Sequence, residues 1–192
     1  MSSTMRIYVM GGPGSGKTTL AKRLSGQLSH PFYEMDVIGW ENGYGAERPL
    51  ETRQADIHQI AKQVAWICEG GGWDWTEELY RIADHIVWLD LPWRIAAWRI
   101  VSRHIRASLA GTNRHSGLLK LWRFLRYARV FYLSKDPAFE GNVEIVRKLR
   151  PFMHKVVRCR RPAEVEAFVS RMLLEAQTTD DRMDYHKKEQ QL

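Results

Sequence analysis

The chain has 192 residues, of which 44% are hydrophobic and 27% are charged, as is typical of one globular domain with its own apolar core. Its two cysteines, Cys68 and Cys159, lie far apart without CxxC or metal-ligand spacing, which argues against a disulfide or zinc framework. We see no secretory signal and no apolar run long enough to cross a bilayer, and therefore expect a cytoplasmic protein with no membrane partner.

The net charge of +7 is concentrated in one block of the sequence. Residues 1–90 carry 8 Lys/Arg against 12 Asp/Glu, and residues 162–192 carry 4 against 7. Residues 91–161, in contrast, carry 17 against 3. A block with so few acids cannot neutralise itself through internal ion pairs, so we expect an anionic partner there.

Short apolar runs alternate with longer amphipathic stretches, which predicts a parallel sheet covered by helices. We expect strands at 6–10, 31–35, 65–68, 85–89 and 154–158. We expect helices at 16–29, 50–63, 75–83, 93–109, 118–133 and 162–177. Irregular loops are expected at 38–49 and 110–117, and a disordered tail at 177–192.

Between the first strand and the first helix lies the sequence GGPGSGKTT, which matches Gly, four residues, Gly-Lys-Ser/Thr. Its glycines allow a close backbone approach to phosphates, and the start of the helix favours an anion. Lys17 supplies a cation for the phosphates, and Thr18 supplies a hydroxyl ligand for Mg²⁺. The expected nucleotide-binding residues are Gly11, Gly12, Gly14, Ser15, Gly16, Lys17, Thr18 and Thr19. A glycine-rich turn that binds nothing would not require this strand and helix around it.

Three acids follow the second, third and fourth strands: Asp36, Glu69 and Asp90. Ligands of open parallel sheets bind beyond the carboxyl ends of the strands. We therefore expect Asp36 and Glu69 to help hold Mg²⁺ or its waters and to accept the proton of a phosphoryl acceptor. Asp90 fits a functional role and a structural cap equally well.

Arginines dominate the two helices of the basic block. Arg99, Arg103 and Arg106 recur at i, i+4 and i+7 on one helical face, and Arg114 lies in the following loop. If residues 99–129 form a lid, then Arg103, Arg106 and Arg114 reach the transferring phosphates as catalytic residues. The alternative is a solvated basic face.

Other residues are open to two interpretations or point to packing. Arg48 and Arg53 are candidates for an anionic group of the acceptor, and surface positions suit them equally well. Arg158, Arg160 and Arg161 are candidates for contact with a purine ring. Tryptophans that we expect to be structural or to fill the core are Trp73, Trp75, Trp88, Trp98 and Trp122.

Over about residues 5–175 the chain resembles the adenylate-kinase-like bacterial DNA topology-modulation proteins, within the P-loop nucleoside and nucleotide kinase superfamily. The resemblance rests on GGPGSGKTTLAKRLS, FYEMD, HIVWLDLPW and the arginine-rich helix that runs into GTNRHSG. It implies a three-layer α/β/α P-loop NTPase fold over residues 1–176, with a five-stranded parallel sheet and a helical arginine-rich lid. It also implies ATP at 11–18, Asp36 on the acceptor side, and lid contacts from Arg103, Arg106 and Arg114. Relatives usually carry an Asp-Gly-Asn-Tyr-like run where this chain has Glu69 and three glycines, so that either the acceptor differs or acceptor phosphorylation is lost.

These observations predict a Mg²⁺- and ATP-dependent small-molecule kinase. Its acceptor is expected to be a nucleoside, a nucleotide-like compound or another small molecule, and the protein to be a monomer or a weak dimer. The rival hypothesis is a nucleotide-dependent regulator that binds DNA or RNA through the basic helices. No recognisable nucleic-acid-binding motif accompanies the arginines, which makes this hypothesis weaker.

Overall fold

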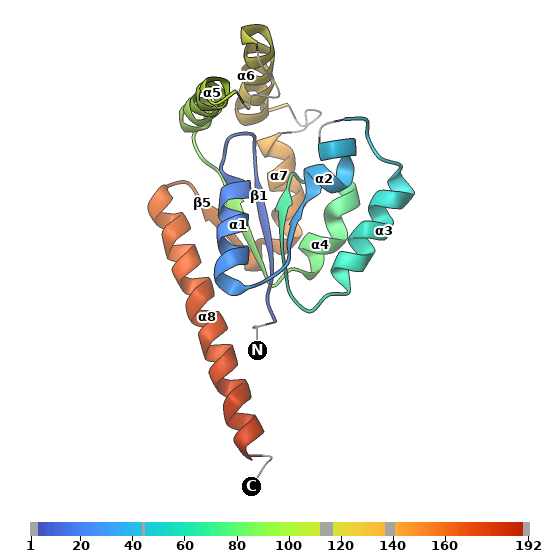
Figure 1. Cartoon of the computed structure of the whole chain (residues 1–192), viewed down its shortest axis with the longest axis vertical. Helices are drawn as coiled ribbons and strands as arrows, with labels where there is room; N and C mark the ends of the chain where they lie inside the picture. Colours follow the sequence, from blue (N-terminus) through green and yellow to red (C-terminus); the bar gives the residue numbers. More distant parts are fainter. Residues whose placement is uncertain (1–3, 44, 112–116, 137–140, 190–192) are drawn as a thin grey trace.

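The computed structural model describes residues 4–43, 45–111, 117–136 and 141–189, the last ten of them as backbone alone. Within these ranges five parallel strands form one sheet in the order β2-β3-β1-β4-β5 (Figure 1). The strands are β1 (Arg6–Gly11), β2 (Phe32–Glu34), β3 (Trp66–Gly70), β4 (His85–Leu89) and β5 (Val156–Cys159). The predicted five-stranded parallel sheet is thereby confirmed.

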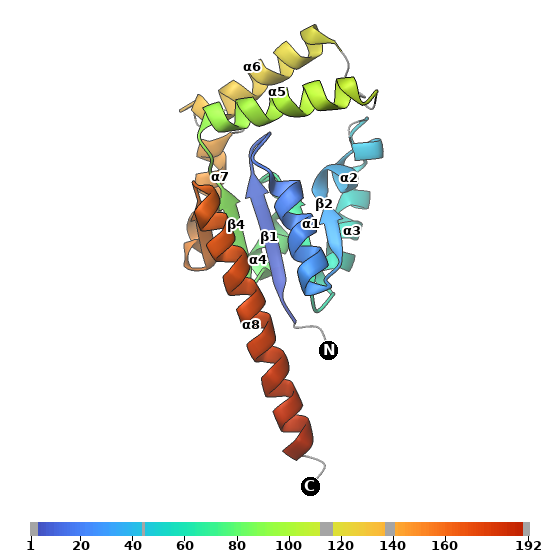
Figure 2. The same ribbon diagram turned by 60° about the vertical axis from the view of Figure 1, so that its left-hand side comes forward.

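Helices cover both faces of the sheet, as Figures 1 and 2 show. Alternate residues of β1 explain the two layers, because Ile7 and Val9 join one apolar cluster whereas Tyr8 and Met10 join the other. The first cluster lies beneath α1 (Lys17–Leu28) and α8 (Pro162–Glu189). The second lies beneath α3 (Leu50–Ala61), α4 (Glu77–Ile82) and α7 (Asn142–Leu149). The fold is therefore the three-layer α/β/α arrangement that the sequence predicted.

Two basic helices, α5 (Trp93–Leu109) and α6 (Leu118–Leu133), form a pair that stands beyond the carboxyl ends of the strands (Figure 2). Both helices have the bounds expected from the sequence. The expectation that Trp98 and Trp122 fill the core is wrong, since these residues are 70% and 56% exposed. Helix α5 turns Ala96 and Ile100 toward the body instead, and Trp98 lies midway between them in sequence and so on the opposite side of the helix.

The structure adds two helices that the sequence analysis missed, α2 (Met35–Gly39) and α7. The described residues also contain three short 3₁₀ turns, namely η1 (Glu41–Gly43), η2 (Asp74–Thr76) and η3 (Arg150–Lys155). Helix α8 continues to Glu189. The sequence analysis, in contrast, expected the helix to end at residue 177 and a disordered tail to follow. Its C-terminal half extends away from the body of the molecule (Figure 2).

We expect Leu24→Ala to lower the free energy of unfolding by about 2–5 kcal/mol, because Leu24 of α1 is fully buried in the cluster shared with α8. Leu174→Ala on α8 is the matched control, since Leu174 is 61% exposed and should change stability by no more than about 0.5 kcal/mol. Urea denaturation of both variants measures the difference. Equal losses in the two variants would contradict this packing of α1 against α8.

Candidate active site

The phosphate loop joins β1 to α1, which is the strand–loop–helix context that the motif requires. Two of its glycines have left-handed backbone angles, with φ of +75° at Gly14 and +91° at Gly16. Gly16 is the N-cap of α1, whose first turn has no acidic residue and no side-chain cap. The first N–H groups of α1 therefore lack helical partners and favour an anion at this end.

A cavity of about 560 Å³ adjoins this loop, a volume within the range of small-molecule sites. One part of its wall is polar, formed by the loop and by arginines of α5, and another part is apolar, formed by side chains near the start of α8. Lining residues include Gly12, Gly14, Ser15, Gly16, Lys17, Thr18, Thr19, Leu20, Leu91, Arg99, Arg103, Arg106, Pro162 and Val165. The structure thus brings Arg103 and Arg106 to the same cavity as the loop. Arg114 lies outside the described residues.

A buried carboxylate lies beneath the loop. Glu69, near the end of β3, is 1% exposed and accepts a 2.8 Å hydrogen bond at Oε1 from the Thr18 hydroxyl. The ammonium of Lys17 lies 3.7 Å from Glu69 Oε2, an oxygen without a hydrogen-bond partner. Burial raises the pKa of Glu69, Lys17 and Thr18 lower it in part, and the nearby acids Asp36 and Glu34 raise it further. This carboxylate is therefore incompletely compensated and suits an additional cation or a proton.

Asp36, which the sequence analysis paired with Glu69, lies in the first turn of α2. It is close enough to raise the pKa of Glu69 through its charge. The register explains the proximity, because Glu34 at the end of β2 is paired with Glu69 on β3, and Asp36 follows two residues later. The two predicted acids are therefore neighbours at the carboxyl edge of the sheet.

Helices α5 and α6 both contact the loop directly. Arg99 Nη1 donates a 2.7 Å hydrogen bond to the carbonyl oxygen of Ser15, and the Tyr132 hydroxyl donates one of 3.1 Å to that of Pro13. A Cβ atom on Gly12 would lie 2.6 Å from the ring of Phe131, so only glycine fits beneath this ring. Sequence reasoning missed Phe131 and Tyr132, whose only signal was their place in the apolar pattern of a helix.

A second cavity of about 320 Å³ lies against the other side of α6 and the glycines that follow Glu69. Aromatic side chains and charged groups share its wall. Its lining includes Glu47, Arg53, Gly71, Gly72, Trp73, Asp74, Trp75, Tyr127, Phe131, Glu144 and Lys148. Phe131 lines this cavity and also contacts the phosphate loop at Gly12, so a single ring lies between the loop and the second cavity.

Arg53 is the most buried cation of the second cavity, with an exposed fraction of 7%. Its Nη1 donates a 2.6 Å hydrogen bond to Glu47, and its guanidinium lies 5.3 Å from the ring centroid of Trp75. Its Nε–H is buried without a partner. By contrast, Lys148 is held by the Gly72 carbonyl and by carboxylates of Asp74 and Glu144, at 2.7 and 2.8 Å. Among the described cations that line this cavity, Arg53 is therefore the one with an N–H group that has no hydrogen-bond partner.

The indoles that the sequence analysis regarded as structural form part of this cavity. Trp73 and Trp75 are stacked at 5.6 Å with an angle of 11° between their planes, and Trp40 contacts both rings edge-on. Trp73 and Trp75 line the cavity. Arg48 points elsewhere, donating to the carbonyl of Ile38 and to Asp56. Arg53, rather than Arg48, is therefore placed to meet a ligand.

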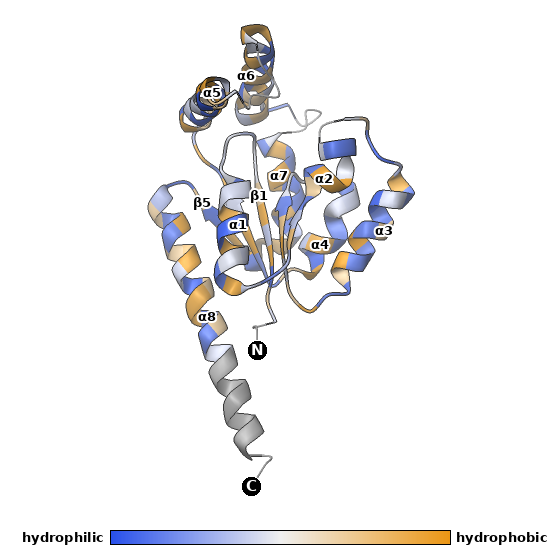
Figure 3. Cartoon of the chain, in the orientation of Figure 1, coloured by the Kyte–Doolittle hydropathy of each residue, from blue (hydrophilic) through white to orange (hydrophobic). Residues whose placement is uncertain are grey.

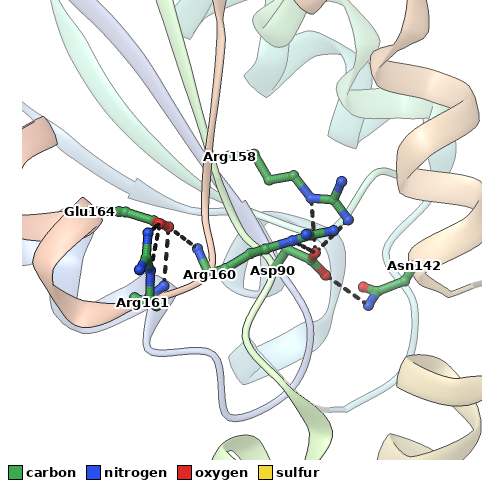
Figure 4. Close-up of polar contacts among 6 residues, drawn as sticks. All are labelled: Asp90, Asn142, Arg158, Arg160, Arg161 and Glu164. Atoms are coloured by element: carbon green, nitrogen blue, oxygen red, sulfur yellow. Dashed lines mark hydrogen bonds and ion pairs between the residues drawn. The ribbon is translucent and has the colours of Figure 1, made fainter.

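Asp90, the third strand-end acid, is committed to a polar network that Figure 4 shows. It accepts hydrogen bonds from Arg158 Nη2 at 2.6 Å, Arg160 Nε at 3.2 Å and Asn142 Nδ2 at 3.3 Å. The guanidinium of Arg158 also lies 4.4 Å from the ring centroid of Trp88. The network ties the end of β4 to β5 and α7, so Asp90 links elements of the fold and does not cap a helix. Arg158 and Arg160 are engaged in this network, and their contact with a purine ring stays a prediction.

Neither a resident metal site nor a membrane span emerges from the described residues. Among them, no three or more His, Cys, Asp or Glu side chains are grouped to hold a metal ion. None of their helices combines the length and apolar character needed to cross a bilayer.

Comparison with known proteins agrees with this geometry. The model of the ATPase family associated with various cellular activities (AAA) matches residues 7–69, less than half of the chain. A shikimate kinase of Microcystis aeruginosa is 29% identical over 147 residues, which are 69% of this chain and 75% of that protein. An uncharacterized protein from Eubacterium ventriosum has a TM-score of 0.50 at 12% identity, over 90% of this chain and 98% of that one. A gluconokinase from Sinorhizobium meliloti has a TM-score of 0.49 at 18% identity, over 95% and 99%.

The matched segment 7–69 begins in β1, includes the whole phosphate loop and ends at Glu69. Together with the sheet order and the kinase relative, it places the chain in the P-loop kinase superfamily. The chain is a P-loop phosphotransferase, which confirms the class predicted from the sequence. Membership of the narrower topology-modulation family stays a prediction.

We expect Glu69→Gln to stabilise the protein at neutral pH while reducing any phosphoryl transfer by about 10²-fold or more. Because the folded-state pKa of Glu69 lies above its ordinary value of 4.5, the folded chain loses stability as pH rises through these values. The glutamine variant lacks this loss, so its advantage should shrink as pH falls from the raised folded-state pKa toward 4.5 and change no further below that value. Urea unfolding at a series of pH values measures it. A difference that does not vary with pH would contradict the assignment.

Proposed function

We propose that the chain transfers the γ-phosphoryl group of Mg²⁺–ATP to a hydroxyl group of a small acceptor. The observation that carries this proposal is the buried Glu69 carboxylate, held beneath the phosphate loop by Thr18 and Lys17. Phosphoryl transfer needs phosphates and Mg²⁺ to be held together with a group that orients the acceptor. The loop, the buried acid and a second cavity beside the loop offer these three functions within one edge of the sheet.

The first cavity suits the nucleotide. The glycine-rich backbone from Gly11 to Gly16, with Ser15, Lys17, Thr18 and Thr19, would surround the phosphates. Arg99, Arg103 and Arg106 supply permanent positive charge on the opposite wall. The apolar end, formed by Leu91, Pro162 and Val165, offers a surface for the base. Thr18 would ligate Mg²⁺ that arrives with ATP, and Glu69 would hold a metal-bound water.

The second cavity suits the acceptor. Phe131 separates it from the loop by one ring, and Asp36 lies next to Glu69 at the same edge of the sheet. Asp36 would orient the acceptor hydroxyl or accept its proton. The unpartnered Nε–H of buried Arg53 favours an acceptor with a carboxylate or another anionic group. The names of the relatives, a shikimate kinase and a gluconokinase, agree with a small hydroxylated acid.

The basic helices would act as the lid that the sequence analysis predicted over residues 99–129. Arg103 and Arg106 face the nucleotide cavity, which supports contact with ATP more than a role in DNA or RNA binding. Arg114 would complete this set. In this proposal the lid arginines stabilise charge on the transferring phosphoryl group, and the tight contact of α6 with the loop fixes the hinge end of the lid.

Lys17→Ala should weaken the binding of Mg²⁺–ATP by at least about tenfold, because it removes a charge aimed at the phosphates. Isothermal titration calorimetry with a non-hydrolysable ATP analogue measures the change. Lys22→Ala is the control, since it removes a lysine from the same helix outside the cavity lining. If both variants bind the analogue as the unmodified protein does, the nucleotide site is not at this loop.

A panel of sugar acids, polyols, nucleosides and nucleoside monophosphates, assayed for acceptor-dependent ADP release, tests the acceptor assignment. We expect turnover with a small hydroxylated acid, and expect Arg53→Lys to raise its KM about tenfold or more while leaving the affinity for the ATP analogue unchanged. Arg48→Lys is the control, because Arg48 bonds to Asp56 instead of lining the cavity. Preference for a nucleoside over every acid, with no effect of Arg53→Lys, would contradict the assignment.

A further inference from the structure

Helix α5 carries an apolar stripe whose side chains are more than half exposed. Trp98, Ile105 and Leu109 are 70%, 51% and 85% exposed. Their spacing of i, i+7 and i+11 places them within about 40° of one another around the helix axis. The buried residues Ala96 and Ile100 occupy the opposite side. The stripe therefore points away from the nucleotide cavity and the sheet.

Helix α6 carries a second stripe of the same kind. Leu119, Trp122, Val130 and Leu133 are 61%, 56%, 37% and 53% exposed. Their spacing confines them to roughly one quarter of the helix surface, away from Tyr132, which is buried against the loop. Large exposed apolar areas on two adjacent helices are uncommon in a protein that acts alone in water.

Positive charge surrounds both stripes. Between Asp90 and Asp136 the sequence contains no Asp or Glu. The exposed basic residues of the described part of this segment are Arg94, Arg103, Arg106, Lys120, Arg123, Arg126, Arg129 and Lys135. Arg126 lies over the ring of Trp122 at 5.7 Å, so charge and apolar surface alternate within one patch. Figure 3 shows hydrophilic and hydrophobic residues interspersed along α5 and α6.

We propose that the exposed faces of α5 and α6 dock on the surface of an anionic phospholipid bilayer. Helices with Trp and Leu on one side and arginines beside them lie in the interface, where headgroups meet the cations and the acyl boundary receives the apolar side chains. An anionic bilayer thus satisfies both features of the patch together. Arg99, which contacts the loop, and Arg103 and Arg106, which line the nucleotide cavity, take no part in the docking, and the proposal does not depend on the kinase chemistry.

Two other partners match only one of the features. Nucleic acid would neutralise the arginines, but its phosphates would leave Leu109 and Leu119 in water. A second copy of the chain would cover the apolar stripes, but pairing two patches without acidic residues would bring like charges together. Charge and apolar area together therefore favour the bilayer.

This proposal revises the expectation of no membrane partner. That expectation rested on the lack of a continuous apolar run, which is the signature of a spanning helix. Side chains of an interfacial helix recur at helical spacing between charged residues, so the average hydropathy of the segment stays low. The structure, by separating exposed from buried residues, distinguishes a surface stripe from a core-facing one.

Flotation of the full chain with vesicles tests the proposal. One set of vesicles is phosphatidylcholine alone, and the other is an equimolar mixture of phosphatidylcholine and phosphatidylglycerol. We expect binding to the mixed vesicles only, weakened by salt. The double variant Trp98→Ser/Leu109→Ser should lose at least about tenfold in affinity. Leu174→Ser on α8, which changes an exposed leucine elsewhere, should bind as the unmodified protein does.

Four results would overturn the proposal of bilayer docking. Absence of binding to the mixed vesicles rejects it directly, as does binding that the double variant retains in full. Salt-sensitive binding to duplex DNA without vesicle binding would assign the patch to nucleic acid instead. A stable dimer in sedimentation that the double variant dissociates, again without vesicle binding, would assign the patch to self-association. Thermal unfolding of each variant shows that it is folded.

Discussion

The structure depends on one buried charge at the end of the central sheet. Glu69 is enclosed between β3 and the first turn of α1, and its only close ionic partner among the described residues is Lys17, at 3.7 Å. Burying a carboxylate costs free energy unless it is paired and hydrogen-bonded. Thr18 satisfies one of its oxygens and leaves the other without a hydrogen bond. The site therefore suits a further positive charge, which in the proposed function is the Mg²⁺ ion bound to the nucleotide.

Asp90 lies at the end of β4, as Glu69 lies at the end of β3, but it is fully paired with protein donors. Both acids lie at the carboxyl end of a strand, yet Asp90 receives donors from Arg158, Arg160 and Asn142 and is thereby compensated. The donors come from β5, the segment after it and α7, so the carboxylate holds elements together. How fully a strand-end acid is compensated thus depends on how many donors reach it, which is a property of the fold and not of its place in the sequence.

Periodicity and motif spacing were enough to predict the sheet, helices α5 and α6 and the phosphate loop, because each has a local signature. The short helices α2 and α7 were missed since five and eight residues give too few repeats of a pattern. The exposure of Trp98 and Trp122 could not be foreseen, because an apolar residue does not reveal which side of a helix meets the body. Even an accurate prediction of a helix does not say which of its sides packs against the rest of the protein.

The candidate acceptor cavity shows the same limit. Arg53 was one of two equivalent arginines in the sequence, and only the fold shows that Arg48 is paired with Asp56 whereas Arg53 Nε has no partner. Likewise Phe131 separates two cavities because α6 folds back over Gly12, a contact between residues far apart in the chain. These features arise from tertiary packing, which no local pattern encodes.

The central claim is that the buried carboxylate awaits a cation delivered with the nucleotide. Calorimetry of a magnesium-bound, non-hydrolysable ATP analogue, in buffers that differ in ionisation enthalpy, gives the number of protons released on binding. Burial raises the pKa of Glu69, so its carboxyl group keeps a proton to higher pH than an ordinary glutamate does, and arrival of Mg²⁺ should expel that proton. The account predicts more proton release from the unmodified protein than from Glu69→Gln, with the excess growing as the pH is lowered toward the folded-state pKa. Equal release from the two proteins at every pH would contradict it.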